Sequence, residues 1–451
     1  MRAELLRRPR VGPYLDGMTS SDKPGIGSRT FAGLLVAQFT AAFNDQALHA
    51  AAMFFAINTG ALADKDAIAL LPVLFYAPWA VFCTLTGSVA DRFSKRTVLL
   101  TWKWLELGIC GLAAVGFWFG SAGELAGVWL VLGCVVLMGT HAAFFGPAKY
   151  GLMPEILPPH QMSRGNGWLE CLSFLAVILG TVSGGALSFA CRGDEWVIGV
   201  ALFALAAVGT ACGYWIRPVP AAHPTRRFPR FVYVPIVGAV RDMWVSPRLR
   251  LALVGIALFT GVATFLRSTM YILGETRTPR WDELTTSAVV GTIAVGIGLG
   301  SPVAGHLSGP AVRVRFILFG GVGMAGACLL AGFATEVVAA LVACIVAVGF
   351  FAGFYLVPLF TLLQQAGPKE TKGVMVATSN FVDVFGAVLA SATFYAVVSV
   401  VRAAGVPPGD APMWLLIAAT ALIVLCLFWL RGAVRRAETG QHSSPRSGDG
   451  L

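Results

Sequence analysis

Apolar residues occur along the chain in repeated blocks, and short polar segments separate these blocks. A helix needs roughly 20 residues to cross a bilayer, because each residue adds about 1.5 Å of length. Two clear blocks cover 125–145 and 414–430. The whole pattern predicts helices at roughly 31–60, 67–90, 97–119, 125–148, 166–190, 197–216, 250–273, 285–307, 316–335, 337–366, 374–400 and 412–431. We therefore expect an all-α polytopic membrane protein of about twelve transmembrane helices.

A stretch rich in Pro and Arg divides the predicted helices into two sets of six. The expected parts are a cytoplasmic N-terminal tail at 1–30, a six-helix half at 31–216, a cytoplasmic linker at 217–249, a second half at 250–431 and a cytoplasmic tail at 432–451. We expect an interfacial helix in the linker near residues 232–245. The tail from Arg435 is polar and rich in Ser and Gly, so it is predicted to be disordered.

Two loops in equivalent places indicate an internal repeat. Gly87 and Lys95 follow the second predicted helix, and Gly305 and Arg313 follow the eighth with the same spacing. A parallel repeat of six helices about an axis along the membrane normal is typical of paired transporter halves.

Composition and charge agree with a membrane protein. Only 12% of the residues are charged and 57% are hydrophobic, whereas soluble domains carry about 25% charged residues. A net charge of +10 first suggests nucleic acid as a partner. However, most of the 33 Lys and Arg residues lie between apolar blocks, on one side of the membrane if the N-terminus is inside. We therefore predict cytoplasmic termini and no nucleic-acid partner.

The loop after the second predicted helix reads GSVADRFSKR from Gly87 to Arg96. It resembles the signature G-x-x-x-D-R-x-x-[RK]-R of the major facilitator superfamily at every fixed position. The resemblance implies two pseudo-symmetric six-helix halves. It also implies a cytoplasmic charge network in which Asp91, Arg92 and Arg96 latch the halves together. The second-half loop has Gly309 in place of the aspartate, so the expected latch is asymmetric.

A second stretch, GTHAAFFGPAKYG at 139–151, looks like the bacterial lysophospholipid transporter family. Segments 43–46, 164–167, 355–359 and 380–381 also match. That family includes carriers fused to acyltransferase and acyl-ACP synthetase modules. The resemblance implies flipping of lysophospholipid, such as lysophosphatidylethanolamine, across a bacterial cytoplasmic (inner) membrane by alternating access. It also implies the lipid bilayer and a separate acyltransferase or acyl-ACP synthetase as candidate partners.

Several ionisable side chains fall inside predicted helices, where a charge costs about 2.5–3.5 kcal/mol at the bilayer centre. They are Asp45, His49, Lys103, Glu106, His141, Lys149, Glu170, Arg267 and Asp383. We assign Asp45 and Arg267 to substrate binding, because they lie in the first helix of each half, which lines the cavity in the resembled superfamily. His49, His141 and Lys149 complete the substrate-binding set. We assign Lys103, Glu106, Glu170 and Asp383 to the gating network with the signature loop.

Each assignment has a structural alternative. Lys103 and Glu106 are three residues apart and can form a purely structural ion pair. His141 can be a hydrogen-bonded packing residue in an apolar helix. Lys149 lies near the inner end of its helix and can extend to phospholipid headgroups.

A zwitterionic lysophospholipid suits the candidate site. Its phosphate requires a cation such as Arg267 or Lys149, and its ammonium requires a carboxylate such as Asp45. The acyl chain requires an apolar wall, for which the candidate residues are Phe54, Phe55, Phe144, Phe145 and Phe265.

Two other functions fit the same sequence. The first is a proton-coupled carrier of another small amphipathic solute, with Asp45 or Asp383 carrying the proton. The second is a non-transporting scaffold for lipid-remodelling enzymes, whose basic linker and tails dock on anionic lipids. No catalytic residues, metal-ligand spacing or phosphate-binding Gly-rich loop are found in the sequence. We therefore expect neither an enzyme nor a bound metal or cofactor.

Overall fold

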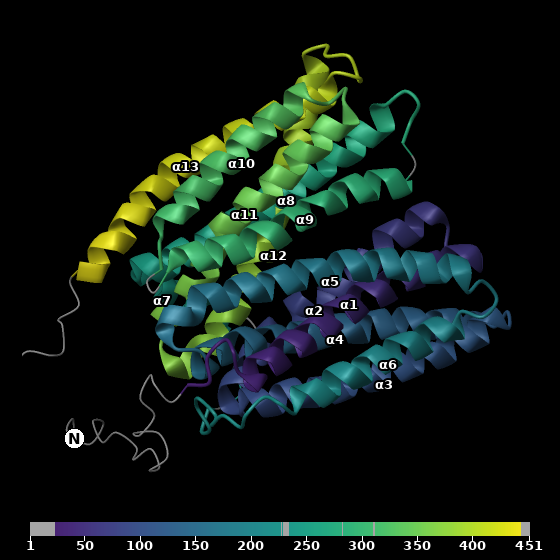
Figure 1. Cartoon of the computed structure of the whole chain (residues 1–451). Coiled ribbons are helices and arrows are strands. Elements are labelled where there is room, and N and C mark those ends of the chain that lie inside the picture. Colours follow the sequence, from purple (N-terminus) through teal and green to yellow (C-terminus); the bar gives the residue numbers. More distant parts are fainter. Residues whose placement is uncertain (1–22, 227, 229–233, 282, 310–311, 443–451) are drawn as a thin grey trace, which may run out of the picture.

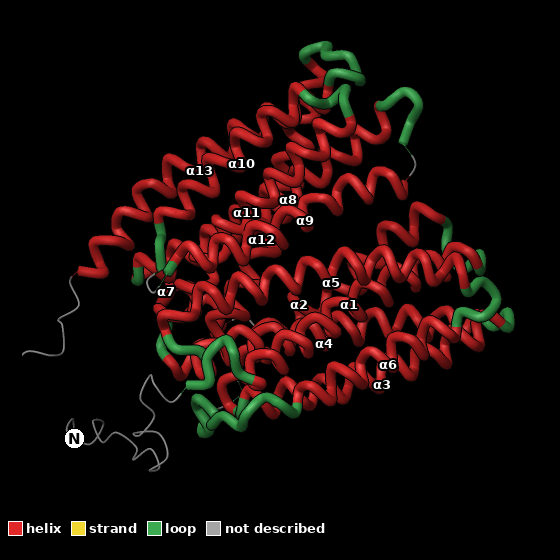
Figure 2. Tube along the Cα trace, viewed as in Figure 1, coloured by secondary structure: helices red, strands yellow, loops and turns green. Residues whose placement is uncertain are grey.

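The computed structural model describes residues 23–226, 228, 234–281, 283–309 and 312–442, and this part of the chain is all-helical without strands (Figures 1 and 2). The helices are α1 (Arg29–Asn58), α2 (Asp64–Arg92), α3 (Lys95–Ser121), α4 (Leu125–Ile156), α5 (Met162–Ala190), α6 (Trp196–Gly213), α7 (Val234–Val245), α8 (Pro247–Thr276), α9 (Glu283–Ser308), α10 (Arg315–Phe333), α11 (Val338–Ala366), α12 (Lys372–Ala403) and α13 (Ala411–His442). Two short 3-10 helices, η2 (Pro159–Gln161) and η3 (Lys369–Thr371), precede α5 and α12.

Eleven of the described helices are long and apolar enough to cross a membrane. Helix α1 is not among them, although its 30 residues exceed the length needed for a span. Its middle carries Asn44, Asp45, Gln46 and His49, which lower its hydropathy. With α1 the long helices of the described chain number twelve, so the predicted polytopic all-α architecture is confirmed.

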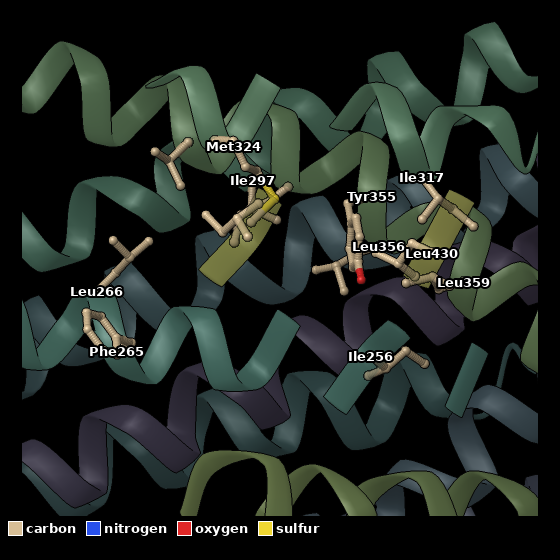
Figure 3. Close-up of a cluster of buried hydrophobic side chains, with 14 of the residues drawn as sticks. Ile256, Phe265, Leu266, Ile297, Ile317, Met324, Tyr355, Leu356, Leu359 and Leu430 are labelled. Carbon is tan, nitrogen blue, oxygen red and sulfur yellow. The ribbon is translucent and has the colours of Figure 1, made fainter. Parts of the chain in front are cut away.

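The hydrophobic cores of the two halves are separate. The two main cores of the first half contain buried side chains from α1 to α6, such as Phe55 and Leu152. The largest core of the second half is built mainly from α8 to α13. Figure 3 shows Tyr355 among aliphatic side chains of this core, and its hydroxyl donates a hydrogen bond to the Gly255 carbonyl at 3.0 Å. Each half therefore has a packed interior of its own.

The halves meet closely at one end of the molecule. Near the end of α2, a Cβ on Gly87 would lie 2.6 Å from the Val374 Cα at the start of α12. Near the start of α5, a Cβ on Gly167 would lie 2.5 Å from the Ser301 carbonyl oxygen of α9. Only glycine permits these approaches. The helix axes of the two halves diverge toward the opposite end (Figure 2).

The last helix was predicted to end at 431 and the chain to be disordered from Arg435, but α13 continues to His442. Ala433, Val434 and Ala437 are buried against the second half. The Arg315 guanidinium also forms an ion pair with Glu438 at 2.9 Å. These contacts stabilise about three more turns of helix than the hydropathy pattern predicts.

Helix α4 also extends beyond its predicted end at 148 and reaches Ile156. It continues through Pro147 and Pro154, and Leu152 and Met153 in the extra segment are fully buried. Packing of this face outweighs the hydrogen bonds that the prolines remove. Helix α7 lies where a linker helix was expected and exposes Val237 and Trp244. Its location at the membrane interface stays a prediction.

Candidate functional site

A buried ion pair lies inside the first half. Lys103 and Glu106 stand one turn apart on α3, and the Lys103 Nζ lies 2.6 Å from the Glu106 Oε2. Both residues are fully buried. Lys103 also donates to the Thr40 hydroxyl at 3.0 Å, and the Asn44 amide donates to the Glu106 Oε1 at 2.8 Å. The structural pair anticipated as the alternative is therefore formed, with polar support from α1.

His141 lies between this pair and Asp45. Its Nε2 lies 3.4 Å from the Glu106 Oε2, and its Nδ1 lies 3.7 Å from the Asp45 Oδ1. A neutral imidazole can donate to only one of these carboxylates, whereas a protonated imidazole can donate to both. The imidazole is fully buried, so it connects two carboxylates away from water.

Asp45 interacts with His141, beside the Lys103–Glu106 pair, and also with a second charged residue, Lys149. Its Oδ1 accepts no hydrogen bond from the described residues. The Lys149 ammonium interacts electrostatically with both Asp45 and Glu170. It also lies 4.5 Å from the centre of the Tyr150 ring. The Tyr150 hydroxyl in turn donates to the Glu170 Oε1 at 2.9 Å.

Tyr150 brings this group to the boundary between the halves. Its ring stacks on Phe360 of α11 with the ring centres 5.0 Å apart. Glu170, which was assigned to the gating network, therefore lies with Lys149 and Tyr150 instead of with Asp91. Lys103 and Glu106 likewise lie about two turns into α3, away from the signature loop.

The second half contributes Arg267 from α8 and Asp383 from α12. Arg267 is exposed, and its charge acts on His49 and on Tyr76 of the first half. The Asp383 Oδ1 is buried and accepts no hydrogen bond within the described part of the chain. Its charge acts on Tyr150. Cationic and anionic side chains from both halves therefore face the region between them.

The proposed acyl wall is only partly supported. Phe55 is buried against Phe117, with the ring centres 4.9 Å apart. Phe265 is buried against Phe394 at 5.1 Å (Figure 3 labels Phe265). Both rings belong to the interior of their own half and cannot line a shared cavity. Phe54 is exposed beside Gly185 of α5.

Phe144 and Phe145 of the expected wall are also buried. Phe144 stacks on Trp102 with the ring centres 4.4 Å apart. Phe145 lies 5.4 Å from the ring centre of His141. Phe145 therefore packs beside the buried polar group, and both rings are buried away from a lipid chain.

The signature loop contacts the second half through Asp91. Asp91 is fully buried, and its carboxylate accepts backbone hydrogen bonds from Gly373 at 2.7 Å and Val374 at 3.2 Å. These two donors belong to the first turn of α12, where unpaired N–H groups favour an anion. Arg226 of the linker adds an ion pair to Asp91 at 3.1 Å. Arg226 also donates to the Glu370 carbonyl at 3.4 Å.

Arg92 and Arg96 bind the linker side and not the second half. The Arg92 guanidinium lies 4.6 Å from the ring centre of Phe228. Arg96 donates a hydrogen bond to the Ile216 carbonyl and lies over the Tyr214 ring. Of the three predicted latch residues, Asp91 is the one that hydrogen-bonds to the second half within the described part of the chain. Arg226 was not identified as a partner, because nothing in the linker distinguishes one arginine from its neighbours.

Removal of the Asp91 carboxylate tests whether its contacts with α12 keep this end of the molecule closed. Asp91→Ala should shift the protein away from the conformation in which this end is closed, because three hydrogen bonds to a charged group are lost. Such bonds contribute about 1.5–3 kcal/mol each. The measurement is the distribution of spin-label distances between the end of α2 and the start of α12. Asp66→Ala, near the opposite end of α2 and exposed, is the matched control. An unchanged distribution in Asp91→Ala would refute the latch.

The sequence of this chain is similar to those of known proteins. The family model described as Major Facilitator Superfamily matches residues 34–391. The chain is 29% identical over 365 residues to the lysophospholipid transporter LplT of Serratia proteamaculans, covering 80% of this chain and 86% of the relative. It is 28% identical over 360 residues to the Escherichia coli protein of the same name, covering 79% and 85%.

Solved transporter structures share the fold. A bacterial homologue of the iron transporter ferroportin, in an outward-facing state, superposes with a TM-score of 0.67 at 16% identity, covering 90% of this chain and 99% of that one. The major facilitator superfamily transporter FucP, in an outward conformation, gives a TM-score of 0.65 at 15% identity, covering 89% and 98%.

Proposed function

This chain belongs to the major facilitator superfamily, and from that we propose that it moves lysophospholipid across the bacterial cytoplasmic membrane by alternating access. The observation that carries the proposal is the set of charged side chains of both signs between the halves. Membrane-embedded charges are retained chiefly where a substrate or ion uses them. The relatives named as lysophospholipid transporters support the same substrate class.

The site offers a partner for each charge of a zwitterionic headgroup. Arg267 of the second half, which is exposed, suits the phosphate, because a guanidinium can bind two phosphate oxygens at once. The Asp45 carboxylate, which lies beside His141 and in reach of the Lys149 charge, suits the ammonium. The Lys149 ammonium interacts electrostatically with Asp45 and Glu170, and it can approach the phosphate from the first half. The headgroup would therefore bridge the two halves.

Alternating access requires the closed end to open. In the present conformation α2 contacts α12 and α5 contacts α9 at the end predicted to be cytoplasmic. The Asp91 contacts to α12 must break before a lipid can leave at that end. A lysophospholipid released there would be available for reacylation, so we propose a separate acyltransferase or acyl-ACP synthetase as the consumer.

Flipping by the reconstituted protein is the direct test. Proteoliposomes that contain the full chain should move labelled lysophosphatidylethanolamine between leaflets faster than empty liposomes do. Equal rates would overturn the proposal and would leave a non-transporting scaffold as the better explanation.

Proton coupling is a second candidate, and His141 favours it. Its imidazole lies within 3.7 Å of two carboxylates, one of which is the proposed headgroup ligand Asp45. Gain or loss of one proton at His141 would change the net charge of this group. An imposed pH gradient should then change the flipping rate in the wild-type protein but not in His141→Asn. A rate that is indifferent to the gradient would exclude this candidate.

A further inference from the structure

A cluster of lysines lies at the closed end of the molecule, apart from the central charged residues. Lys23 lies in the segment before α1 and Lys95 begins α3 of the first half, whereas Lys369 and Lys372 belong to the second half. Glu155, near the end of α4, is the carboxylate that acts on Lys23 and Lys372, and Glu370 of η3 is exposed beside Lys369. None of these residues has a role in the function proposed above.

The first-half members converge on the end of α4. The Lys95 ammonium is fully buried and forms an ion pair with the Glu155 Oε1. The Lys23 ammonium donates to the Pro154 carbonyl at 2.7 Å. The Gly25 N–H donates to the Ile156 carbonyl at 3.1 Å, so the segment before α1 is held against α4.

The second-half members reach the same place. Lys372 begins α12 and directly precedes Gly373, whose N–H binds Asp91 across the boundary between the halves. The Lys372 side chain is half-buried and interacts electrostatically with Glu155, Lys95 and Lys23. Lys369 lies in η3 and is exposed, so it is on the solvent-facing side of the cluster. Burial and the neighbouring Lys369 ammonium lower the pKa of Lys23.

The cluster carries an excess of positive charge. Four ammonium groups stand against two carboxylates, Glu155 and the exposed Glu370, and the Glu155 Oε1 is already bound to Lys95. The Oγ1 of Thr371 in η3 is buried and has no hydrogen-bond partner in the described chain, so this hydroxyl has a free donor. Like charges in a partly buried site repel each other unless an anion neutralises them.

We propose that this cluster binds a phosphate-bearing anion between the two halves. Lys23, Lys369 and Lys372 would hold the phosphate oxygens, and the Thr371 hydroxyl would donate a further hydrogen bond. The Lys95 ammonium is already paired with Glu155, so it would not bind the phosphate directly. Lysine ammonium groups are common phosphate ligands.

The anion would stabilise one conformation of the transporter. Its ligands come from both halves, so it can bind with full affinity only when this end is closed. By linkage, bound anion favours the closed end and opposes its opening. The anion comes from one of two sources, namely the headgroup of an anionic lipid in the adjacent leaflet or free phosphate in solution.

The experiment uses the full chain in nanodiscs of zwitterionic phosphatidylcholine. Inorganic phosphate should raise the midpoint of thermal unfolding saturably, by about 2 °C or more, and should narrow the α2–α12 distance distribution. Chloride at the same ionic strength is the control for simple screening of the lysines. In a second arm, nanodiscs with phosphatidylglycerol replace the added phosphate. A rise only in that arm would identify a lipid headgroup as the ligand.

Substitutions in the cluster test whether these lysines cause the response to phosphate or phosphatidylglycerol. Lys369→Gln should weaken the response to phosphate or phosphatidylglycerol several-fold, and Lys369→Gln with Lys372→Gln should abolish it. Arg402→Gln is the matched control, because Arg402 is an exposed cation near the other end of α12. Equal effects of chloride and phosphate with no effect of phosphatidylglycerol, or an undiminished response in the double variant, would overturn the proposal. Neither result depends on lipid flipping, so this site can fail while the transport function stands.

Discussion

Lys103→Met is expected to lower the free energy of unfolding by about 3–5 kcal/mol, the usual cost of removing one partner from a buried ion pair. The substitution would leave the Glu106 carboxylate fully buried beside His141 and without its lysine partner. The hydrogen bond to Thr40 would also be lost. The measurement is equilibrium unfolding of the purified protein in a fixed detergent or nanodisc.

The control for this prediction is Arg402→Met, which removes an exposed cation near the end of α12 and should change the unfolding free energy by less than about 0.5 kcal/mol. Adding Glu106→Gln to Lys103→Met should recover part of the loss, because the unpaired carboxylate is then neutral. Equal stability of Lys103→Met and Arg402→Met would show that the pair carries no stabilising role.

Asp45→Asn should reduce flipping of lysophosphatidylethanolamine by about 10- to 100-fold. The loss of one hydrogen bond to a charged group is worth about 1.5–3 kcal/mol, and each 1.4 kcal/mol is a factor of ten. The effect should be much smaller for lysophosphatidylglycerol, whose headgroup has no ammonium. The comparison of the two lipids in the same proteoliposome assay separates recognition of the headgroup from general damage.

Arg267→Ala should impair both lipids by a similar factor, because both carry a phosphate. Asp66→Asn, at an exposed carboxylate of α2, should leave both rates unchanged. An Asp45→Asn rate that falls equally for both lipids would assign Asp45 to packing or conformational change and remove it from ammonium recognition.

Much of the helical architecture was predictable because the bilayer imposes a length and a polarity on each span. The buried pair of Lys103 and Glu106 was also predictable, since residues three apart on a helix face the same way. The end of α13 was not, because Arg315 and Glu438 are far apart in sequence. Hydropathy alone assigned Glu438 to a disordered tail.

Asp91 shows the same difference between what the sequence predicts and what tertiary packing decides. The signature loop identified Asp91 as a gating residue from the sequence. Its actual partners are two backbone N–H groups at the start of α12 and one arginine of the linker. Backbone donors carry no residue type that a sequence could reveal. Arg92 and Arg96 matched the signature equally well, yet they hold the linker and the end of α6.

The amino-acid pattern thus settles which segments lie in the membrane and which polar residues are unusual there, because transfer free energy depends on composition and length. Which of those residues meet is a property of the packed halves. Asp45, His141 and Lys149 converge because α1 and α4 pack together, and Arg267 faces His49 and Tyr76 because α8 faces the first half. The lysine cluster exists only when α12 closes on α4, since its members come from four separate segments. Long-range contacts of this kind arise from tertiary packing, and no local pattern encodes them.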